Sequence, residues 1–249
     1  MARIALALDP AEHPAELGPC ARPRFEPAEV RAGLTAAGHQ LVDERADVHV
    51  IDVDLPGPGT PPAAAPGPRV VLVSLARPRD PWHAIGDAAE RQPFIEPWAE
   101  DLRARKHAAL SRRADAYADS VDDLVAAIET VLRPAGTEPP ALRYCGALFN
   151  SAAIRPGTYF PLGAEARTFV LGRSITADVS IPTPQLARAH LQIAVGGEDG
   201  LEVIDLGGTN GTWMCQPAGE VVALRAGATV RARAGALLVP DASFRFLVA

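Results

Sequence analysis

Short runs of alternating apolar and polar residues fill the C-terminal part of the chain, and glycine or proline ends most of them. The clearest runs cover residues 167–171, 177–181, 190–195 and 201–206. Alternation of this kind places every second side chain on one face, which is typical of a half-buried β-strand. Further short apolar runs continue from residue 221 to residue 248. The pattern therefore predicts an all-β domain of the sandwich or barrel type.

The N-terminal part shows another pattern, in which apolar runs alternate with stretches of helical spacing. Strands are expected at residues 4–8, 48–53 and 69–75. Helices are expected at residues 27–41, 97–113 and 121–132. Asp119 or Ser120 can cap the last helix, and Arg133-Pro134 ends it. Strands that alternate with helices favour an open α/β sheet.

The length of 249 residues is enough for two domains with separate cores. We expect an α/β domain over residues 1–134, a linker over residues 135–145 and a β-sandwich domain over residues 146–249. Prolines at residues 134, 139 and 140 would stiffen the linker. Residues 141–157 are apolar enough to pack on either domain or to join the first strand of the sandwich.

Three short motifs occur in order between the predicted C-terminal strands. They are Leu-Gly-Arg-Ser at residues 171–174, Arg-Ala-His at residues 188–190 and Asp-Leu-Gly-Gly-Thr-Asn-Gly-Thr at residues 205–212. The ordered set resembles the forkhead-associated (FHA) domain, a β-sandwich whose loops bind phosphothreonine in a partner protein. The resemblance covers about the last 90 residues, a reasonable size for one domain.

The resemblance implies roles for individual residues in these loops. In the family the arginine contacts phosphate, the threonine shapes or binds the site, and the asparagine holds the ligand backbone. A guanidinium suits a phosphate because it offers charge-assisted donors in a fixed geometry. The implied phosphopeptide-binding residues are Arg173, Ser174, Arg188, Thr209 and Asn210. The implied structural residues of the loops are Gly172, His190 and Gly211.

One position departs from the family pattern. Three residues before the histidine, FHA domains usually carry a serine whose hydroxyl and backbone amide bind phosphate, and this chain has Ala187. Loss of one hydroxyl donor to a charged acceptor costs roughly 1.5–3 kcal/mol. Arg173 and Arg188 would compensate through their charge. The alternative is a structural FHA sandwich that meets its partner through another surface.

The N-terminal half resembles the receiver domain of response regulators, which implies a flavodoxin-like open α/β sheet. The resemblance rests on residues 46–57 around Asp52, on residues 70–74 ending at Ser74, and on residues 114–128. It implies that Asp52 is the candidate phospho-acceptor, that Asp9 is an acidic Mg²⁺ ligand and that Ser74 is the hydroxyl that senses the phosphoryl group.

Two departures weigh against phosphotransfer in this half. Receivers usually place two acids at the end of the first strand because a hard divalent cation needs carboxylate oxygens, and Leu8 takes the first of these positions. Receivers also have a lysine after the last strand, where this chain reads Ala-Asp-Ser at residues 118–120. The only lysine of the chain is Lys106, in a predicted helix. A degenerate receiver is therefore expected, with a response regulator phosphorylated on Asp52 as the alternative.

The composition of the chain bears on its binding partners, its cellular compartment and its capacity to bind metal. The net charge of −6 and the lack of a basic run give no support for nucleic-acid binding. Three widely spaced cysteines favour a reducing compartment, and residues 1–8 are too short for a signal peptide or a membrane span, so we expect a cytoplasmic protein. The six histidines show no metal-ligand spacing.

Common catalytic motifs are absent from the sequence, including the P-loop and the GxSxG elbow. We therefore expect no enzymatic activity, no catalytic residue, no metal and no cofactor. Ala-Gly-His at residues 37–39 before an apolar strand also occurs in TIR-like folds, which leaves an NAD- or nucleotide-processing enzyme as a second class. The main hypothesis is a signalling adaptor that binds a phosphorylated protein and that meets a second protein, or a second copy, through its N-terminal domain.

Overall fold

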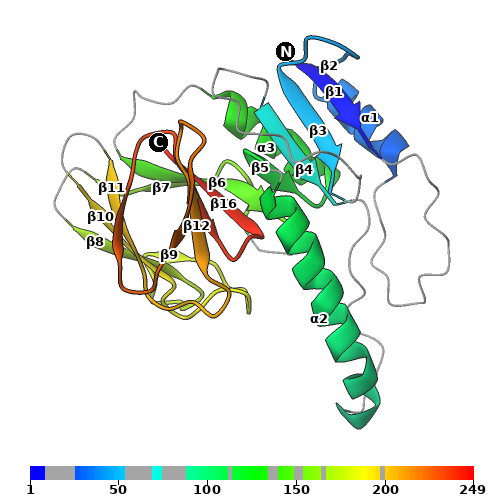
Figure 1. The fold of residues 1–249 in the computed structure, drawn as a ribbon. Helices are drawn as coiled ribbons and strands as arrows, with labels where there is room; N and C mark the ends of the chain where they lie inside the picture. The colour runs from blue at the N-terminus through cyan, green and yellow to red at the C-terminus, as the bar shows by residue number, and fades with distance from the viewer. Residues whose placement is uncertain are drawn as a thin grey trace.

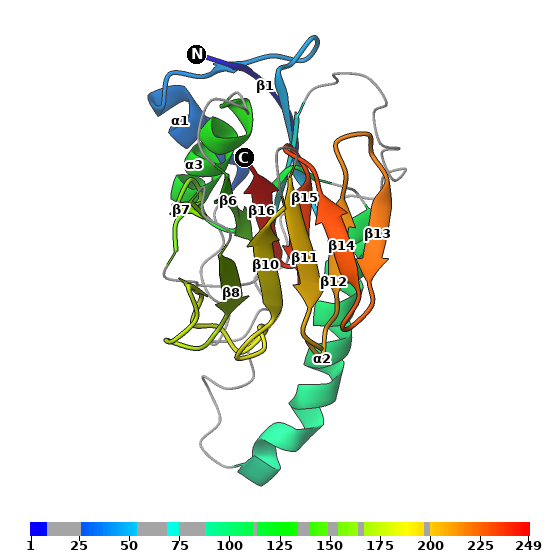
Figure 2. The same cartoon turned by 90° about the vertical axis from the view of Figure 1, so that its left-hand side faces the viewer.

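The computed structural model of the protein describes most of the chain, and Figures 1 and 2 show it from two sides. The described residues are 1–8, 26–53, 69–74, 88–111, 114–133, 140–148, 154–163, 167–196 and 200–249. The N-terminal part contains a parallel sheet with helices, and the C-terminal part contains two mainly antiparallel sheets that face each other. None of the helices in the described ranges is long and apolar enough to cross a membrane.

The N-terminal sheet has five strands. They are β1 (Arg3–Ala7), β2 (Gln40–Leu41), β3 (Val48–Asp52), β4 (Arg69–Val73) and β5 (Ala116–Ala118). Their order across the sheet is β2-β1-β3-β4-β5, and each neighbouring pair is parallel. Buried valines fill the central strands, as in a sheet covered on both faces. The strands predicted from the three apolar runs are therefore present.

Two helices pack together on the core of this sheet. Val30 and Leu34 of α1 (Pro27–Ala36) and Leu124 and Ile128 of α3 (Val121–Leu132) are buried in one apolar cluster with the strand valines. Ser120 caps α3, since its hydroxyl accepts a hydrogen bond from the Asp123 amide at 3.2 Å. The prediction for α3 is confirmed at both ends.

The prediction of one helix over residues 27–41 is wrong at its C-terminal end. The helix α1 ends at Ala36, and Gly38 follows with φ of 81°. Glycine reaches this left-handed conformation without steric cost, so the chain leaves the helix there. Gln40 and Leu41 form β2 and pair with β1 in parallel. A two-residue edge strand carries too little periodicity to be recognised from the sequence.

The helix α2 (Ala88–Ser111) begins nine residues earlier than predicted and contains Pro93 and Pro97. The prediction placed Pro97 near the helix start, where a missing N–H costs nothing. In the structure each proline removes one N–H donor, and the helix continues on its remaining hydrogen bonds. Both views show α2 running away from the sheets, with only its C-terminal turns against the rest of the molecule (Figures 1 and 2).

The C-terminal part is a sandwich of two sheets with the orders β14-β11-β10-β8-β9 and β13-β12-β15-β16-β6-β7. The first sheet consists of β8 (Thr168–Gly172), β9 (Val179–Ser180), β10 (Leu191–Val195), β11 (Leu201–Asp205) and β14 (Thr229–Ala232). The second consists of β6 (Ala141–Ala147), β7 (Tyr159–Pro161), β12 (Thr212–Cys215), β13 (Val221–Leu224), β15 (Leu237–Pro240) and β16 (Phe244–Val248). The four predicted strands correspond to β8, β9, β10 and β11.

The inner faces of the two sheets form one core. Phe169, Leu171 and Ile193 come from the first sheet, and Tyr144 and Phe246 from the second. The rings of Tyr144 and Phe246 lie 5.3 Å apart with a tilt of 49°, a favourable geometry for aromatic pairs. The alternation that predicted the strands is thus the alternation of core and outer positions.

The strand β6 joins the two halves. Tyr144 packs in the sandwich core, whereas the next residue, Cys145, packs in the core of the parallel sheet. Burial raises the pKa of the Cys145 thiol to about 12. The expected linker, residues 135–145, therefore overlaps a buried strand from Ala141 onward, because this segment supplies apolar side chains to both cores.

A buried arginine also lies between the halves. Arg245 of β16 is inaccessible to solvent and donates a hydrogen bond to the Tyr117 hydroxyl of β5 at 3.1 Å. Its guanidinium carbon lies 4.9 Å from the centre of the Tyr117 ring, in cation–π geometry. Burial raises the pKa of the Tyr117 phenol above its ordinary value. The sandwich and the parallel sheet are therefore packed against each other through polar as well as apolar contacts.

Candidate functional site

Three loops lie together at one end of the sandwich. They are residues 173–178 after β8, residues 181–190 before β10 and residues 206–211 after β11. The Arg173 amide donates a hydrogen bond to the Ala187 carbonyl at 2.9 Å, and the Ser174 amide donates one to the Arg188 carbonyl at 3.1 Å. The first two loops are thus joined through their backbones, which brings two of the predicted binding residues, Arg173 and Arg188, onto neighbouring segments.

Gly172 allows this close approach. A Cβ atom at this position would lie 2.3 Å from the Arg188 carbonyl oxygen and 3.0 Å from the Ala187 carbonyl oxygen. Both neighbours are backbone atoms, which cannot move aside as a flexible side chain can. The structural role implied for Gly172 therefore has a steric reason, namely the distance between two loop backbones.

His190 is buried beneath the loops. Its Nδ1 accepts a hydrogen bond from the Ala187 amide at 3.2 Å, so the ring proton resides on Nε2, which lies 3.1 Å from the Thr212 hydroxyl. Burial lowers the pKa of His190 below its ordinary value, which keeps the ring neutral. The Leu206 amide also donates to the His190 carbonyl at 2.9 Å. His190 therefore connects the second and third loops.

The third loop is fixed by hydrogen bonds to Asp205 and by close packing on the His190 ring. The buried Asp205 carboxylate accepts hydrogen bonds from the amides of Gly207 at 2.6 Å and Gly208 at 3.0 Å. A Cβ atom on Gly208 would lie 2.4 Å from His190 Cε1, so only glycine fits over the ring. The Gly211 amide donates to the Gly208 carbonyl at 3.0 Å, and Gly211 has φ of 73°. The loop is thus a fixed turn.

The side chains available to a ligand lie above this support. Arg173, Arg188 and Thr209 are exposed, and neither guanidinium has a hydrogen-bond or ion-pair partner among the residues that the structure describes. The Ser174 hydroxyl lies 2.8 Å from the hydroxyl of Thr176 in the same turn. The loops therefore present two unpaired positive groups together with hydroxyl groups.

Ala187 changes the donor set in a way that the sequence did not predict. The missing serine hydroxyl was evident from the sequence. The structure adds that the backbone amide of Ala187 is directed to His190 Nδ1 at 3.2 Å. An anion on these loops would therefore receive neither a hydroxyl nor an amide hydrogen bond from residue 187. The two arginines would have to balance its negative charge.

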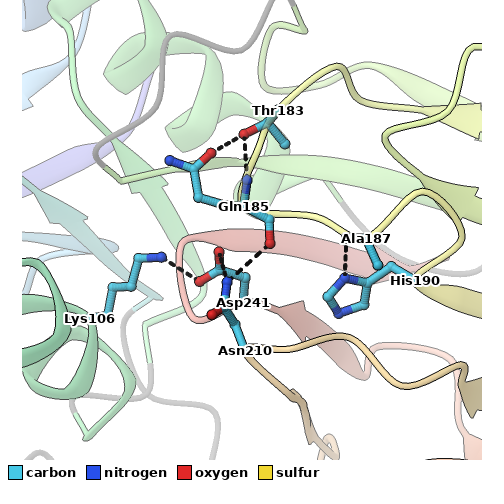
Figure 3. A network of polar contacts seen from close by, with 7 residues as sticks. All are labelled: Lys106, Thr183, Gln185, Ala187, His190, Asn210 and Asp241. Carbon is cyan, nitrogen blue, oxygen red and sulfur yellow. Dashed lines mark hydrogen bonds and ion pairs between the residues drawn. The ribbon is translucent and has the colours of Figure 1, made fainter. Parts of the chain in front are cut away.

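Asn210 has contacts that sequence reasoning missed (Figure 3). Its Nδ2 donates to the Gln185 carbonyl oxygen and to Asp241 Oδ2, both at 3.1 Å. Asp241 Oδ1 in turn accepts a hydrogen bond from Lys106 Nζ at 2.6 Å. Asp241 and Lys106 lie 31 and 104 residues away from Asn210 along the chain, and no local motif marks either of them.

The predicted residues of the N-terminal half lie at the carboxyl edge of the parallel sheet. Asp52 ends β3, and Ser74 follows β4, the neighbouring strand. Both side chains are buried. Asp119, which follows β5 and was not predicted, is also buried at this edge. Asp9 lies outside the described residues, and its predicted place beside Asp52 stays a prediction.

The described residues contain no cluster of three or more histidine, cysteine, aspartate or glutamate side chains that could hold a metal ion. Among these described residues, Asp52, Ser74 and Asp119 come together at one edge of the sheet. Within the described part of the chain, the clearest grouping of exposed and unpaired polar side chains is therefore the one on the sandwich loops.

Comparison with known protein families identifies the segment that contains these loops. Residues 169–232 match the family model of the FHA domain, so this segment of the chain is an FHA domain. The match begins in β8 and ends in β14, and it contains all three loops. The search of curated proteins finds no match.

Several solved FHA domains also superpose on part of the chain. The FHA domain of the CT664 protein from Chlamydia trachomatis is 19% identical and covers 45% of this chain and 97% of its own, with a TM-score of 0.34. An FHA domain of a hypothetical protein from Arabidopsis thaliana is 21% identical and covers 47% of this chain and 92% of its own, with a TM-score of 0.35. The FhaA FHA domain, solved with the intracellular domain of Rv3910, is 20% identical, with 44% and 99% covered and a TM-score of 0.31.

Proposed function

We propose that the sandwich, which begins with β6 at Ala141, binds protein segments that carry phosphothreonine and that the protein is a signalling adaptor. The observation that carries the proposal is the pair of exposed guanidinium groups, Arg173 and Arg188, on two loops joined by backbone hydrogen bonds. The FHA match at residues 169–232 supports it, because FHA domains recognise phosphorylated motifs with such groups.

The charge of the site supports a phosphorylated partner in particular. The protein carries a net charge of −6, yet the two loop arginines have no acidic partner among the described residues. Unpaired arginines attract a dianion, and each guanidinium offers several donors in one plane. In this proposal Arg173, Arg188, Ser174 and Thr209 hold the phosphate, and Asn210 holds the backbone of the bound segment.

The threonine selectivity rests on the family alone. Phosphoserine offers the same dianion, so the charge of the loops by itself does not separate the two residues. A methyl group distinguishes them, and a matching apolar contact is worth about 0.8 kcal/mol for each buried methyl-sized group. Peptides with phosphoserine in place of phosphothreonine therefore measure this part of the proposal separately.

For the N-terminal half we infer a flavodoxin-like, receiver-like domain that binds a second protein or a second copy of this chain. Its strand order, β2-β1-β3-β4-β5 with parallel pairs, is the order of that fold and supports the inference. The burial of Asp52 argues against its use as a phospho-acceptor, because a phosphodonor must reach the carboxylate. This half is then an interaction domain beside the FHA domain.

The experiment compares phosphothreonine peptides from a degenerate library with their unphosphorylated counterparts, using fluorescence anisotropy on the full chain. We expect micromolar binding of phosphorylated members only. Arg173→Ala should weaken this binding by at least about tenfold, since it removes charge-assisted hydrogen bonds. Arg233→Ala is the matched control, because Arg233 is also exposed but lies beyond β14, at the opposite end of the sandwich. Equal binding of both peptide sets would overturn the proposal.

A further inference from the structure

The side-chain amide of Asn210 has a defined orientation in this site. Its two acceptors are the Gln185 carbonyl oxygen and the Asp241 carboxylate, and both lie 3.1 Å from Nδ2. Rotation of the amide by 180° would place Oδ1 against two acceptors, so this orientation is strongly preferred. Both Nδ2 protons are therefore used inside the protein, and Oδ1 has no donor among the described residues. Oδ1 is left to accept a hydrogen bond from a ligand N–H.

The Asp241 carboxylate is held tightly between the loops and the rest of the molecule. Its residue is buried, and its backbone amide donates to the Gly211 carbonyl at 3.1 Å, next to Asn210. Asp241 and Ala242 form the turn between β15 and β16 with φ of 53° and 29°. Left-handed conformations are unfavourable for residues other than glycine, and they persist only where the surroundings enforce them. The turn is therefore fixed by its contacts.

The partner of this carboxylate comes from the N-terminal half. Lys106 lies on α2, and its side chain is 14% exposed in the ion pair with Asp241, whose side chain is 1% exposed. One turn further along, Leu110 packs against the sandwich cluster of Cys215, Leu237 and Val239. The C-terminal turns of α2 thus contact the sandwich at the strand end that carries Asp241. Figure 3 shows the lysine, the aspartate and the asparagine in line.

We propose that Lys106 and Asp241 are positioning residues for Asn210, so that the placement of α2 controls how the loops hold the backbone of a bound segment. The proposal rests on the proposed function, since it concerns the same site. In this arrangement Lys106 orients the Asp241 carboxylate and favours its ionised form. The carboxylate orients the Asn210 amide, and the amide presents Oδ1 to the ligand. A contact between two halves of the chain is thereby part of the ligand site.

The charge state of Asp241 gives the proposal a measurable signature. Burial raises the pKa of Asp241 to about 6, and the attraction of Lys106 offsets only part of this effect. Among the described residues Lys106 is the charged group that faces this carboxylate, and Asn210 is its neutral donor. Removal of Lys106 should raise the pKa of Asp241 further. A larger fraction of the carboxyl would then be protonated at neutral pH, and the protonated form would hold the amide less firmly.

The test measures the affinity of the full chain for its best phosphothreonine peptide from pH 5 to pH 8. We expect Lys106→Gln to weaken binding about tenfold at pH 7 and Lys106→Arg to retain most of it. The ratio of the variant Kd to the wild-type Kd should approach one at pH 5, where Asp241 is protonated in both proteins. Titration of the peptide phosphate cancels in this ratio. A ratio that does not change with pH would indicate a merely structural role and would overturn the proposal.

Two controls separate the possible failures. Arg103→Gln removes the same charge from an exposed position on α2 and should leave binding unchanged. If the wild type binds the phosphopeptide and Arg173→Ala does not, normal binding by Lys106→Gln overturns this inference alone. If the wild type binds no phosphopeptide, the proposed function fails and this inference fails with it.

A measurement without ligand or variant also bears on the proposal. In the wild type, the side-chain amide resonances of Asn210 should shift with a midpoint near pH 6, the pKa of Asp241. Resonances that do not move between pH 5 and pH 8 would overturn the coupling between the carboxylate and the amide.

Discussion

The loop end of the sandwich and the carboxyl edge of the parallel sheet both collect polar residues, but they differ in what they expose. On the sandwich, buried groups such as His190 and Asp205 support the loops, while Arg173 and Arg188 lie exposed above them. At the edge of the parallel sheet, Asp52, Ser74 and Asp119 are all buried. Among the residues described in these two regions, the polar side chains that a protein partner can reach are those on the sandwich loops.

The difference shows that the buried core of a sheet and the exposure of the polar residues at its edge are separate properties. The parallel sheet has the strand order β2-β1-β3-β4-β5, and buried apolar side chains such as Val48 and Val71 form its core. At the edge of this sheet Leu8 is apolar and Asp119 is buried. The sandwich combines a buried core with exposed arginines on its loops.

The largest effect is expected from a substitution that disrupts the loops of the sandwich. Gly172→Ala would place a Cβ atom 2.3 Å from the Arg188 carbonyl oxygen. The two loops that carry Arg173 and Arg188 must then separate. We expect loss of phosphopeptide binding and a destabilisation of roughly 1–3 kcal/mol. Fluorescence anisotropy and thermal unfolding of the same sample measure the two effects.

A second glycine serves as the control for stability. Gly38 has φ of 81° but open space around its Cα, so Gly38→Ala costs roughly 1–2 kcal/mol through backbone strain alone. Gly38→Ala should lower the melting temperature about as much as Gly172→Ala does, and it should leave the affinity for the peptide unchanged. If Gly172→Ala bound the peptide normally, the close contact of the two loops would have no role in recognition.

A smaller effect sharpens the account of the loops. Ala187→Ser adds a hydroxyl donor where the family has one, and a hydrogen bond to a charged acceptor is worth at least about 1.5 kcal/mol. We expect affinity for the phosphopeptide to rise about tenfold, as measured by calorimetry. Ala189→Ser adds the same group two residues along the same loop and should have little effect. An unchanged affinity in Ala187→Ser would mean that the phosphate lies elsewhere.

The smallest effect concerns the parallel sheet. Treatment of the full chain with acetyl phosphate and Mg²⁺ should leave its intact mass unchanged, because Asp52 is buried and Leu8 supplies no second carboxylate at this edge. The buried Asp119 would also repel a phosphoryl dianion. A stoichiometric adduct that disappears in Asp52→Asn would instead identify a working response regulator.

Local patterns explain which features could be predicted from the sequence. The strands β8 to β11 followed from alternation and from their glycine and proline boundaries. The structural roles of Gly172 and His190 were implied by the resemblance to the FHA family. The start of α2 was missed because Pro93 and Pro97 are ordinarily boundary signals. The strand β2 was missed because two residues carry no period.

Long-range contacts explain what could not be predicted. The ion pair between Lys106 and Asp241 spans 135 residues and depends on how α2 docks on the sandwich. The burial of Asp52 likewise depends on elements far away in the chain. Neither follows from residue types or periods. The bond of the Ala187 amide to His190 also depends on how the imidazole ring is packed.

The most direct test of the account maps a bound phosphothreonine peptide onto the full chain by two-dimensional amide NMR. We predict that the largest shift changes fall in residues 172–176, 187–190 and 207–211, that the unphosphorylated peptide causes none of them, and that Asp52, Ser74 and Asp119 do not respond. Shift changes centred on the edge of the parallel sheet, or identical changes with both peptides, would contradict the claim that the sandwich loops bind phosphothreonine.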